Sequence, residues 1–368
     1  MNSIFSMKPI LTLLFVFAVT QASSQPQSDT DADVVSQRGS FRLMPLYQNW
    51  SLDSVKVSEA SVALSLYQPL SRQAAVTLRG AFASASGDIT SLSGATALQL
   101  GGSYYVESAH MMFGLGLGIP VGKKKMKTDE FITSILLASN TLRFNVSQFG
   151  TGFNITPGVV WALPVGEDVV LGLGATYQYR GTFQPLEDLG TFDPGDEISG
   201  TAGIELRLNE TSSIAADLVY THIGKDLLEG NEIYVSGDKL VAALQYKKYF
   251  EFNSLFIGAT FRSKAKSEVA LGNFLAPRFE PDQMEILGAY TVRFSDALST
   301  QFSLEGRFFQ ETSIAFSGYN LFGVGVMPEF SVSESVTIPV RLKFTSGKGK
   351  SNGTITGFEA GLGIVISY

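Results

Sequence analysis

The stretch Val169–Arg180 (VVLGLGATYQYR) alternates residue by residue between two kinds of side chain. One set is apolar or aromatic and comprises Val169, Leu171, Leu173, Ala175, Tyr177 and Tyr179. The other runs from small to polar and ends in a charge. Because successive side chains of a strand point to opposite faces, this pattern predicts one apolar and one small or polar face. Its length suits a tilted membrane-spanning strand, and its two tyrosines are typical of a membrane interface.

The same alternation recurs from residue 40 to the end of the chain and predicts an all-β fold, a transmembrane antiparallel up-and-down β-barrel of about sixteen strands. The expected strands are 40–50, 56–67, 73–86, 93–106, 109–118, 151–163, 168–180, 196–208, 212–222, 237–248, 253–265, 282–295, 299–312, 318–331, 335–346 and 354–367. The alternation is weak in 40–50 and 109–118, so fourteen strands is the alternative.

The lengths of the connections also favour an outer-membrane barrel. Connections after even-numbered strands are short, whereas those after odd-numbered strands are mostly longer, and the longest is 119–150. Outer-membrane barrels have short periplasmic turns and long extracellular loops. The alternation therefore predicts that both chain ends lie on the periplasmic side.

The composition agrees with secretion to the outer membrane of a Gram-negative bacterium. Residues 1–24 resemble a signal peptide, with Lys8 before an apolar core and cleavage expected near Ser24. We expect a periplasmic N-terminal extension over 25–39 and the barrel over 40–368. Without Lys8, 26 Lys and Arg face 34 Asp and Glu, a net charge of −8, which argues against a nucleic-acid partner. The chain contains no Cys, which excludes disulfides and thiolate metal sites.

Charged residues on the expected inward face must contact water or one another. The candidate pore-lining residues are Arg79, Arg180, Arg207, Asp217, Arg262, Glu285, Arg293, Glu305, Arg307, Arg341 and Glu359. Basic residues outnumber acidic ones, which indicates a mildly cationic lumen. Strand register predicts two ion pairs, Arg262 with Glu285 and Arg341 with Glu359. The unpaired surplus, notably Arg79, Arg180, Arg293 and Arg307, is the candidate for solute contact, and inward glycines such as Gly323 are expected to leave space.

The connection 119–150 is the candidate constriction loop. Thr128, Asp129 and Glu130 are suited to the start of a short helix. Phe131, Ile132, Ile135 and Leu136 follow at helical spacing, and we expect this apolar stripe to be covered. The loop either folds into the barrel and narrows it or caps the barrel against neighbouring loops.

No catalytic site, metal site or cofactor is expected. The chain has only two His, His110 and His222, and neither forms a recognisable grouping with a Ser and an acid. Two His without Cys are a poor metal-ligand set. The sequence thus predicts a protein that is not an enzyme.

Three segments resemble the outer-membrane channels grouped with the long-chain fatty-acid transporter and the meta-pathway aromatic-degradation barrels. They are the hairpin from Leu163-Pro164-Val165-Gly166 to Leu171-Gly172-Leu173-Gly174, the loop Phe192-Asp193-Pro194-Gly195-Asp196-Glu197, and Leu115-Gly116-Leu117-Gly118-Ile119-Pro120-Val121-Gly122. The resemblance implies diffusion or uptake of a small, often hydrophobic, solute.

These observations predict a porin-like channel for passive uptake of small solutes, as a monomer or homotrimer in contact with outer-membrane lipid. The first alternative is a gated transporter of hydrophobic or aromatic compounds, with 119–150 forming its binding pocket. The second is a structural or surface-binding barrel with a closed lumen, in which the loops 181–195, 223–236 and 266–281 carry the function.

Overall fold

The computed structural model describes residues 38–368 except 54, 124, 139, 188–189, 270–273, 276–280, 313–317 and 350–352. The expected signal peptide and nearly all of the expected N-terminal extension lie outside the described residues. No helix among the described residues is long and apolar enough to cross a membrane.

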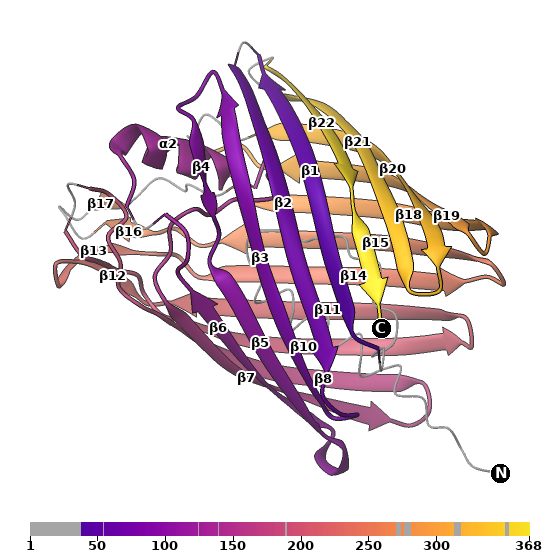
Figure 1. The fold of residues 1–368 in the computed structure, drawn as a ribbon. Helices are drawn as coiled ribbons and strands as arrows, with labels where there is room; N and C mark the ends of the chain where they lie inside the picture. Colours follow the sequence, from indigo (N-terminus) through magenta and orange to yellow (C-terminus); the bar gives the residue numbers. More distant parts are fainter. Residues whose placement is uncertain are drawn as a thin grey trace.

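The described chain forms one closed antiparallel barrel of sixteen membrane-crossing strands (Figure 1). In chain order these are β1 (Ser40–Leu52), β2 (Val55–Pro69), β3 (Ala74–Gly87), β4 (Leu92–Ala95) with β5 (Leu98–Val106), β6 (Met111–Ile119), β7 (Asn154–Val165), β8 (Val169–Arg180), β10 (Glu197–Asn209), β11 (Ser212–Ile223), β14 (Lys239–Tyr249), β15 (Asn253–Lys264), β18 (Gln283–Ser295), β19 (Leu298–Phe309), β20 (Tyr319–Ser333), β21 (Val336–Gly349), and β22 (Thr354–Leu362) with β23 (Ile364–Ser367). The first strand pairs with β22 and β23, which closes the barrel without a free edge.

The strand count of sixteen is confirmed, and the alternative of fourteen is wrong because both weak segments form strands. The first, β1, pairs with β2 along its whole length, and β6 pairs on both sides. Two of the sixteen are interrupted, between β4 and β5 and at Gly363 between β22 and β23. Expected boundaries shift by up to three residues. For example, β6 begins after His110, which adopts a positive φ of 52° and ends a 3₁₀ turn.

The alternation assigns the faces of the strands as expected. On β8, Leu173 is 53% exposed on the outer surface of the barrel, whereas its neighbour Gly172 is buried. Large exposed apolar residues such as Phe261, Phe322 and Phe358 continue this outward set on other strands. A continuous exposed apolar wall around a closed barrel is what lipid covers.

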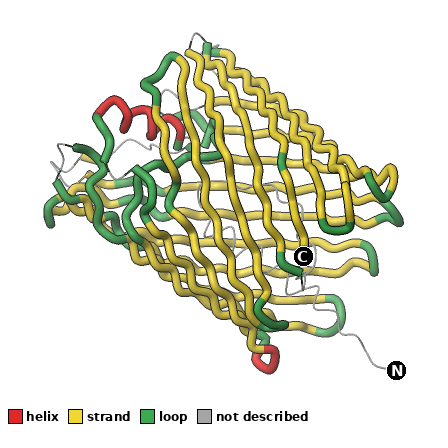
Figure 2. The backbone as a smooth tube through the Cα atoms, viewed as in Figure 1, coloured by secondary structure: helices red, strands yellow, loops and turns green. Residues whose placement is uncertain are grey.

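The two ends of the barrel differ. At one end, which we call the turn side, strands are joined by short turns, and the backbone N–H of Tyr368 donates to the carbonyl of Gly39 at 3.0 Å. The other end, the loop side, carries the helix α2 (Thr128–Leu137) and a small second sheet (Figures 1 and 2). That sheet comprises β9 (Phe192–Asp193), β12 (Lys225–Leu228), β13 (Asn231–Val235), β16 (Glu268–Val269) and β17 (Phe274–Leu275).

Candidate functional site

The longest loop enters the barrel after α2. We call residues 140–149 the inner segment. Gln48 of β1 holds its backbone from both sides, because its amide nitrogen donates to the carbonyl of Arg143 at 3.0 Å and its amide oxygen accepts the N–H of Asn145 at 2.6 Å. Glu59 of β2 accepts the N–H of Val146 at 3.0 Å. These bonds satisfy loop backbone groups that are buried away from bulk water.

An apolar cluster anchors the inner segment to the same part of the wall. The segment contributes Leu142, Phe144, Val146 and Phe149, all buried. The wall contributes Trp50, Leu52, Val57, Ala83, Ala85, Leu92, Phe309, Tyr319, Leu321 and Ile355. Gly357 on β22 makes room for the largest of these, since a Cβ there would lie 2.5 Å from the Trp50 ring. The loop-side lumen is therefore partly filled by a packed core.

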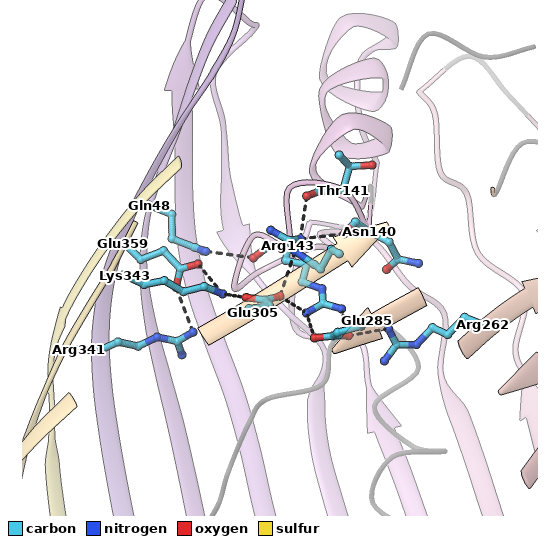
Figure 3. Close-up of polar contacts among 11 residues, drawn as sticks. Gln48, Asn140, Thr141, Arg143, Arg262, Glu285, Glu305, Arg341, Lys343 and Glu359 are labelled. Atoms are coloured by element: carbon cyan, nitrogen blue, oxygen red, sulfur yellow. Dashed lines mark hydrogen bonds and ion pairs between the residues drawn. The ribbon is translucent and has the colours of Figure 1, made fainter. Parts of the chain in front are cut away.

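Arg143 joins the inner segment to a charged network on the wall (Figure 3). Its guanidinium contacts Glu285 of β18 at 2.5 Å and Glu305 of β19 at 3.1 Å. Glu285 also contacts Arg262 of β15 at 3.4 Å. Because two carboxylates meet one bidentate cation here, the position of the loop is fixed by charge as well as by packing.

Glu305 is the centre of this network. Besides Arg143, it contacts the Nε of Arg307 at 3.0 Å and the ammonium of Lys343. The Lys343 contact reaches across β20 at Gly323, where a Cβ would lie 3.3 Å from Lys343 and 3.5 Å from Glu305. This corrects the expectation that Gly323 leaves empty space, because the glycine accommodates an ion pair.

The network continues to Glu359 of β22. Glu359 contacts Arg341 at 3.0 Å and lies 3.9 Å from Lys343. The ion pairs expected from register, Arg262 with Glu285 and Arg341 with Glu359, are both confirmed. Among the residues that the structure describes, the connected groups are five cations and three carboxylates, a surplus of two positive charges: Arg143, Arg262, Arg307, Arg341 and Lys343 against Glu285, Glu305 and Glu359.

Arg307 has a structural role. Its side chain is only 1% exposed, it lies 5.7 Å from the Trp50 ring centre, and it donates to the carbonyl of Thr141 at 2.9 Å. The expectation that Arg307 is an unpaired contact for solute is therefore wrong. By contrast, the side chains of Arg262 and Arg341 remain 23% and 32% exposed.

Two other members of the expected unpaired surplus also have partners. Arg180 contacts Glu197 at 3.3 Å near the loop side. Arg293 contacts Asp296 at 2.9 Å beside a turn, where the Asp296 side chain is fully exposed. The expectation that Arg180 and Arg293 are unpaired is therefore wrong. The partner of Arg180 lies on the neighbouring strand β10, and the partner of Arg293 lies in a connection.

Three predicted lining residues lie elsewhere on the wall. Arg79 is exposed on β3, Arg207 is exposed on β10, and Asp217 is half-buried on β11. Arg79, Arg207 and Asp217 thus lie outside the contacts described above. The structure gathers the following predicted lining residues into one network: Arg262, Glu285, Glu305, Arg307, Arg341 and Glu359.

Sequence reasoning missed Arg143 and Gln48. Arg143 lies in a loop, where strand phase cannot assign a direction. The sequence feature that indicates the inner segment lies on the strands of the wall. Trp50, Val57 and Leu321 occupy inward positions, where a water-filled lumen would carry polar side chains. Such an inward apolar group indicates that another part of the chain covers it.

The helix expected in the loop forms as α2, but its covered face differs from the expectation. Thr133 and Leu137 are buried, whereas Ile132 and Ile135 are 63% and 58% exposed. Phe131 and Leu136 are partly buried against the apolar cluster. The expectation of a fully covered stripe is therefore wrong, because the wall contacts only one side of the helix.

Acidic residues fix the start of α2. Glu130 accepts the backbone N–H of Lys127 at 3.0 Å and contacts the ammonium of Lys123 at 2.5 Å. The hydrogen bond from Lys123 is the main reason that the pKa of Glu130 lies below its usual range. Asp129 accepts the Glu130 N–H at 2.9 Å. The helix begins at Thr128 itself, with Lys127 in the capping position.

The loop is also attached to the connection between β8 and β9 on the loop side. Met126 donates its N–H to the carbonyl of Pro185 and accepts the N–H of Glu187, both at 3.0 Å.

Nothing in the described part of the chain groups three or more His, Asp or Glu residues that could hold a metal ion.

A closed antiparallel barrel with an apolar outer wall and a charged interior defines a transmembrane β-barrel of the outer-membrane type. Neither the protein-family models nor the curated proteins match this chain.

Several solved outer-membrane proteins resemble the fold. The CymD monoaromatic hydrocarbon channel is 11% identical, with a TM-score of 0.48 over 90% of this chain and 89% of its own. The outer membrane protein OpdK from Pseudomonas aeruginosa is 12% identical, with a TM-score of 0.47 over 90% and 99%. A mutant porin of Rhodopseudomonas blastica is 13% identical, with a TM-score of 0.37 over 90% and 100%. The assignment to the barrel class rests on the strands and faces of this chain itself.

Proposed function

We propose that this protein is a passive channel in the outer membrane of a Gram-negative bacterium and that it favours small anionic solutes. The observation that carries the proposal is the surplus of two positive charges in the network around Arg143 and Glu305. Charged groups that line a conduit attract counter-ions and set its selectivity. Outer-membrane lipid covers the apolar wall, and the channel acts as a monomer or a homotrimer.

The inner segment strengthens the effect of the positive network on a passing solute. It brings Arg143 from a loop to the wall and reduces the open cross-section on the loop side. A solute that passes must then move close to Arg262 and Arg341, the network cations with the more exposed side chains. Proximity matters because salt screens exposed charges beyond about 8–10 Å at ordinary ionic strength.

The test is planar-bilayer conductance of refolded residues 25–368 in a KCl gradient at low ionic strength. We expect steady conductance and a reversal potential that shows preference for chloride over potassium. A conducting barrel that prefers potassium would contradict the assigned role of the network.

The apolar cluster supports a second candidate, a gated transporter of hydrophobic or aromatic compounds. Sixteen buried residues fill part of the loop-side lumen, and Trp50, Phe144 and Leu321 are fully enclosed. A correctly folded barrel without conductance, which binds an apolar ligand, would favour this candidate. A silent barrel that binds no ligand, and whose function is lost when a long loop is deleted, would favour the closed structural barrel.

A further inference from the structure

The helix α2 lies against the inner face of the barrel mouth. Thr133 donates its hydroxyl to the carbonyl of Thr90, between β3 and β4, at 3.0 Å. Leu137 belongs to the apolar cluster together with Ala83 and Ala85, which point inward from β3. The covered side of the helix therefore faces the wall, and its opposite side faces away from that wall.

That opposite side carries two isoleucines. Since residues of a helix are about 100° apart, Ile135 lies opposite the wall side marked by Thr133 and Leu137, and Ile132 lies beside Ile135. They are 58% and 63% exposed. Outward residues such as Leu173 face lipid, but a helix on the inner wall does not. A water-facing helix surface is normally polar, so two branched apolar side chains here are available to a ligand in the entrance.

The positive charges lie immediately beyond the same helix. The chain runs from Leu137 directly into the inner segment, and Figure 3 shows α2 above Thr141 and Arg143. Arg262 lies near the loop-side end of β15, whereas Arg341 lies in the turn-side half of β21. A solute that enters along α2 thus meets apolar side chains first and network cations next.

We propose that the entrance and the network form one path for small amphipathic monoanions, molecules that join a compact apolar body to one carboxylate or sulfonate. This inference rests on the proposed function and names its substrate class. The apolar body contacts Ile132 and Ile135 while the anionic group reaches Arg262 and later Arg341. A simple inorganic anion would use only the cations, and a neutral hydrocarbon would use only the isoleucines.

The test compares two permanently charged anions of different apolar area, benzenesulfonate and methanesulfonate. Their permeability ratio is obtained from bi-ionic reversal potentials of refolded residues 25–368 in planar bilayers. We expect the wild-type protein to pass benzenesulfonate at least as well as methanesulfonate, despite its larger size. The double variant Ile132→Ser, Ile135→Ser lowers this ratio about fivefold, the effect of losing roughly 40 Å² of apolar contact.

A matched control is Val55→Ser, which removes an exposed apolar side chain at the tip of the β1–β2 hairpin. It is expected to leave the permeability ratio unchanged. An equal fall in Val55→Ser would overturn the inference, and so would a double variant with the wild-type ratio. If either result came with a retained chloride preference, the proposed function would still stand. Absence of conductance would overturn both the proposed function and this inference.

Discussion

The two halves of the barrel interior differ in the size of their inward side chains. We call one half the plug wall. It consists of β18 to β22 and of β1 to β4, which adjoin one another where the barrel closes. This wall carries Trp50, Arg307 and Leu321 and contacts the inner segment. The small-residue wall, β8 to β14, carries Gly172, Gly174, Gly203 and Ala215 at inward positions. The comparison teaches that the large inward side chains of one wall serve as the core of a docked loop. The small inward residues of the other wall lie beside side chains of neighbouring strand positions, Thr201 at Gly174 and Asp217 at Gly203.

The largest effect is expected on the plug wall when Glu305 is replaced by Gln. Arg143, Arg307 and Lys343 would lose the carboxylate that they share. Breaking a buried ion network by removing one partner costs about 3–5 kcal/mol, because cations remain buried without compensation. The free energy of unfolding, measured in urea with the barrel in detergent or lipid, checks this.

Asp296→Asn is the matched control for Glu305→Gln. Asp296 also pairs with an arginine, Arg293, but its side chain is fully exposed at a turn. Exposed ion pairs contribute only about 0–1 kcal/mol, so little change is expected. Equal losses in the two variants would show that the network on the plug wall does not stabilise the barrel.

A second comparison tests the faces of the small-residue wall. Leu173→Arg places a charge on the lipid face of β8 and should cost roughly 2–4 kcal/mol near the bilayer midplane. Thr176→Arg lies on the opposite face of the same strand and should be tolerated, with a shift toward anions. Folding yield and the reversal potential report the two effects. Equal folding of both variants would contradict the assigned faces.

A smaller effect is expected from Arg341→Gln, which reduces the surplus of the network from two positive charges to one. Arg341 is half-exposed, so its interaction with a passing ion is weakened by water. A unit charge about 8 Å away in water interacts with about 0.5 kcal/mol, which is about twofold in permeability. The chloride-to-potassium permeability ratio should fall by that factor. An unchanged ratio would place the selective charges elsewhere.

The smallest effect concerns the attachment of α2. The lowered pKa of Glu130 means that its contacts with Lys123 and Lys127 stabilise the folded loop above the ordinary pKa of 4.5. This contribution is lost as the pH falls through the lower pKa of the folded state. Methyl NMR signals of Ile132 and Ile135 should shift over that acidic range. Glu130→Gln should remove the shift, and its persistence in this variant would assign the change to another group.

The strands and two ion pairs could be predicted from the sequence because both follow from local periodicity. A period of two assigns Leu173 and Phe358 to the lipid face, and it also places Arg262 beside Glu285 once neighbouring strands are paired. The covered face of α2 could not be predicted, since helical spacing shows that Phe131, Ile132 and Ile135 share a side but not which side meets the wall.

The sequence by itself determined the barrel, its sixteen strands and the apolar outer face, because each strand repeats the same local pattern. Only the tertiary structure decided that Arg143 meets Glu285 and Glu305 and that Gln48 binds the backbone around Asn145. These partners are separated by about a hundred residues or more of sequence. No local period links them. Their contacts depend on the closed barrel, which brings a loop between strands from opposite ends of the chain.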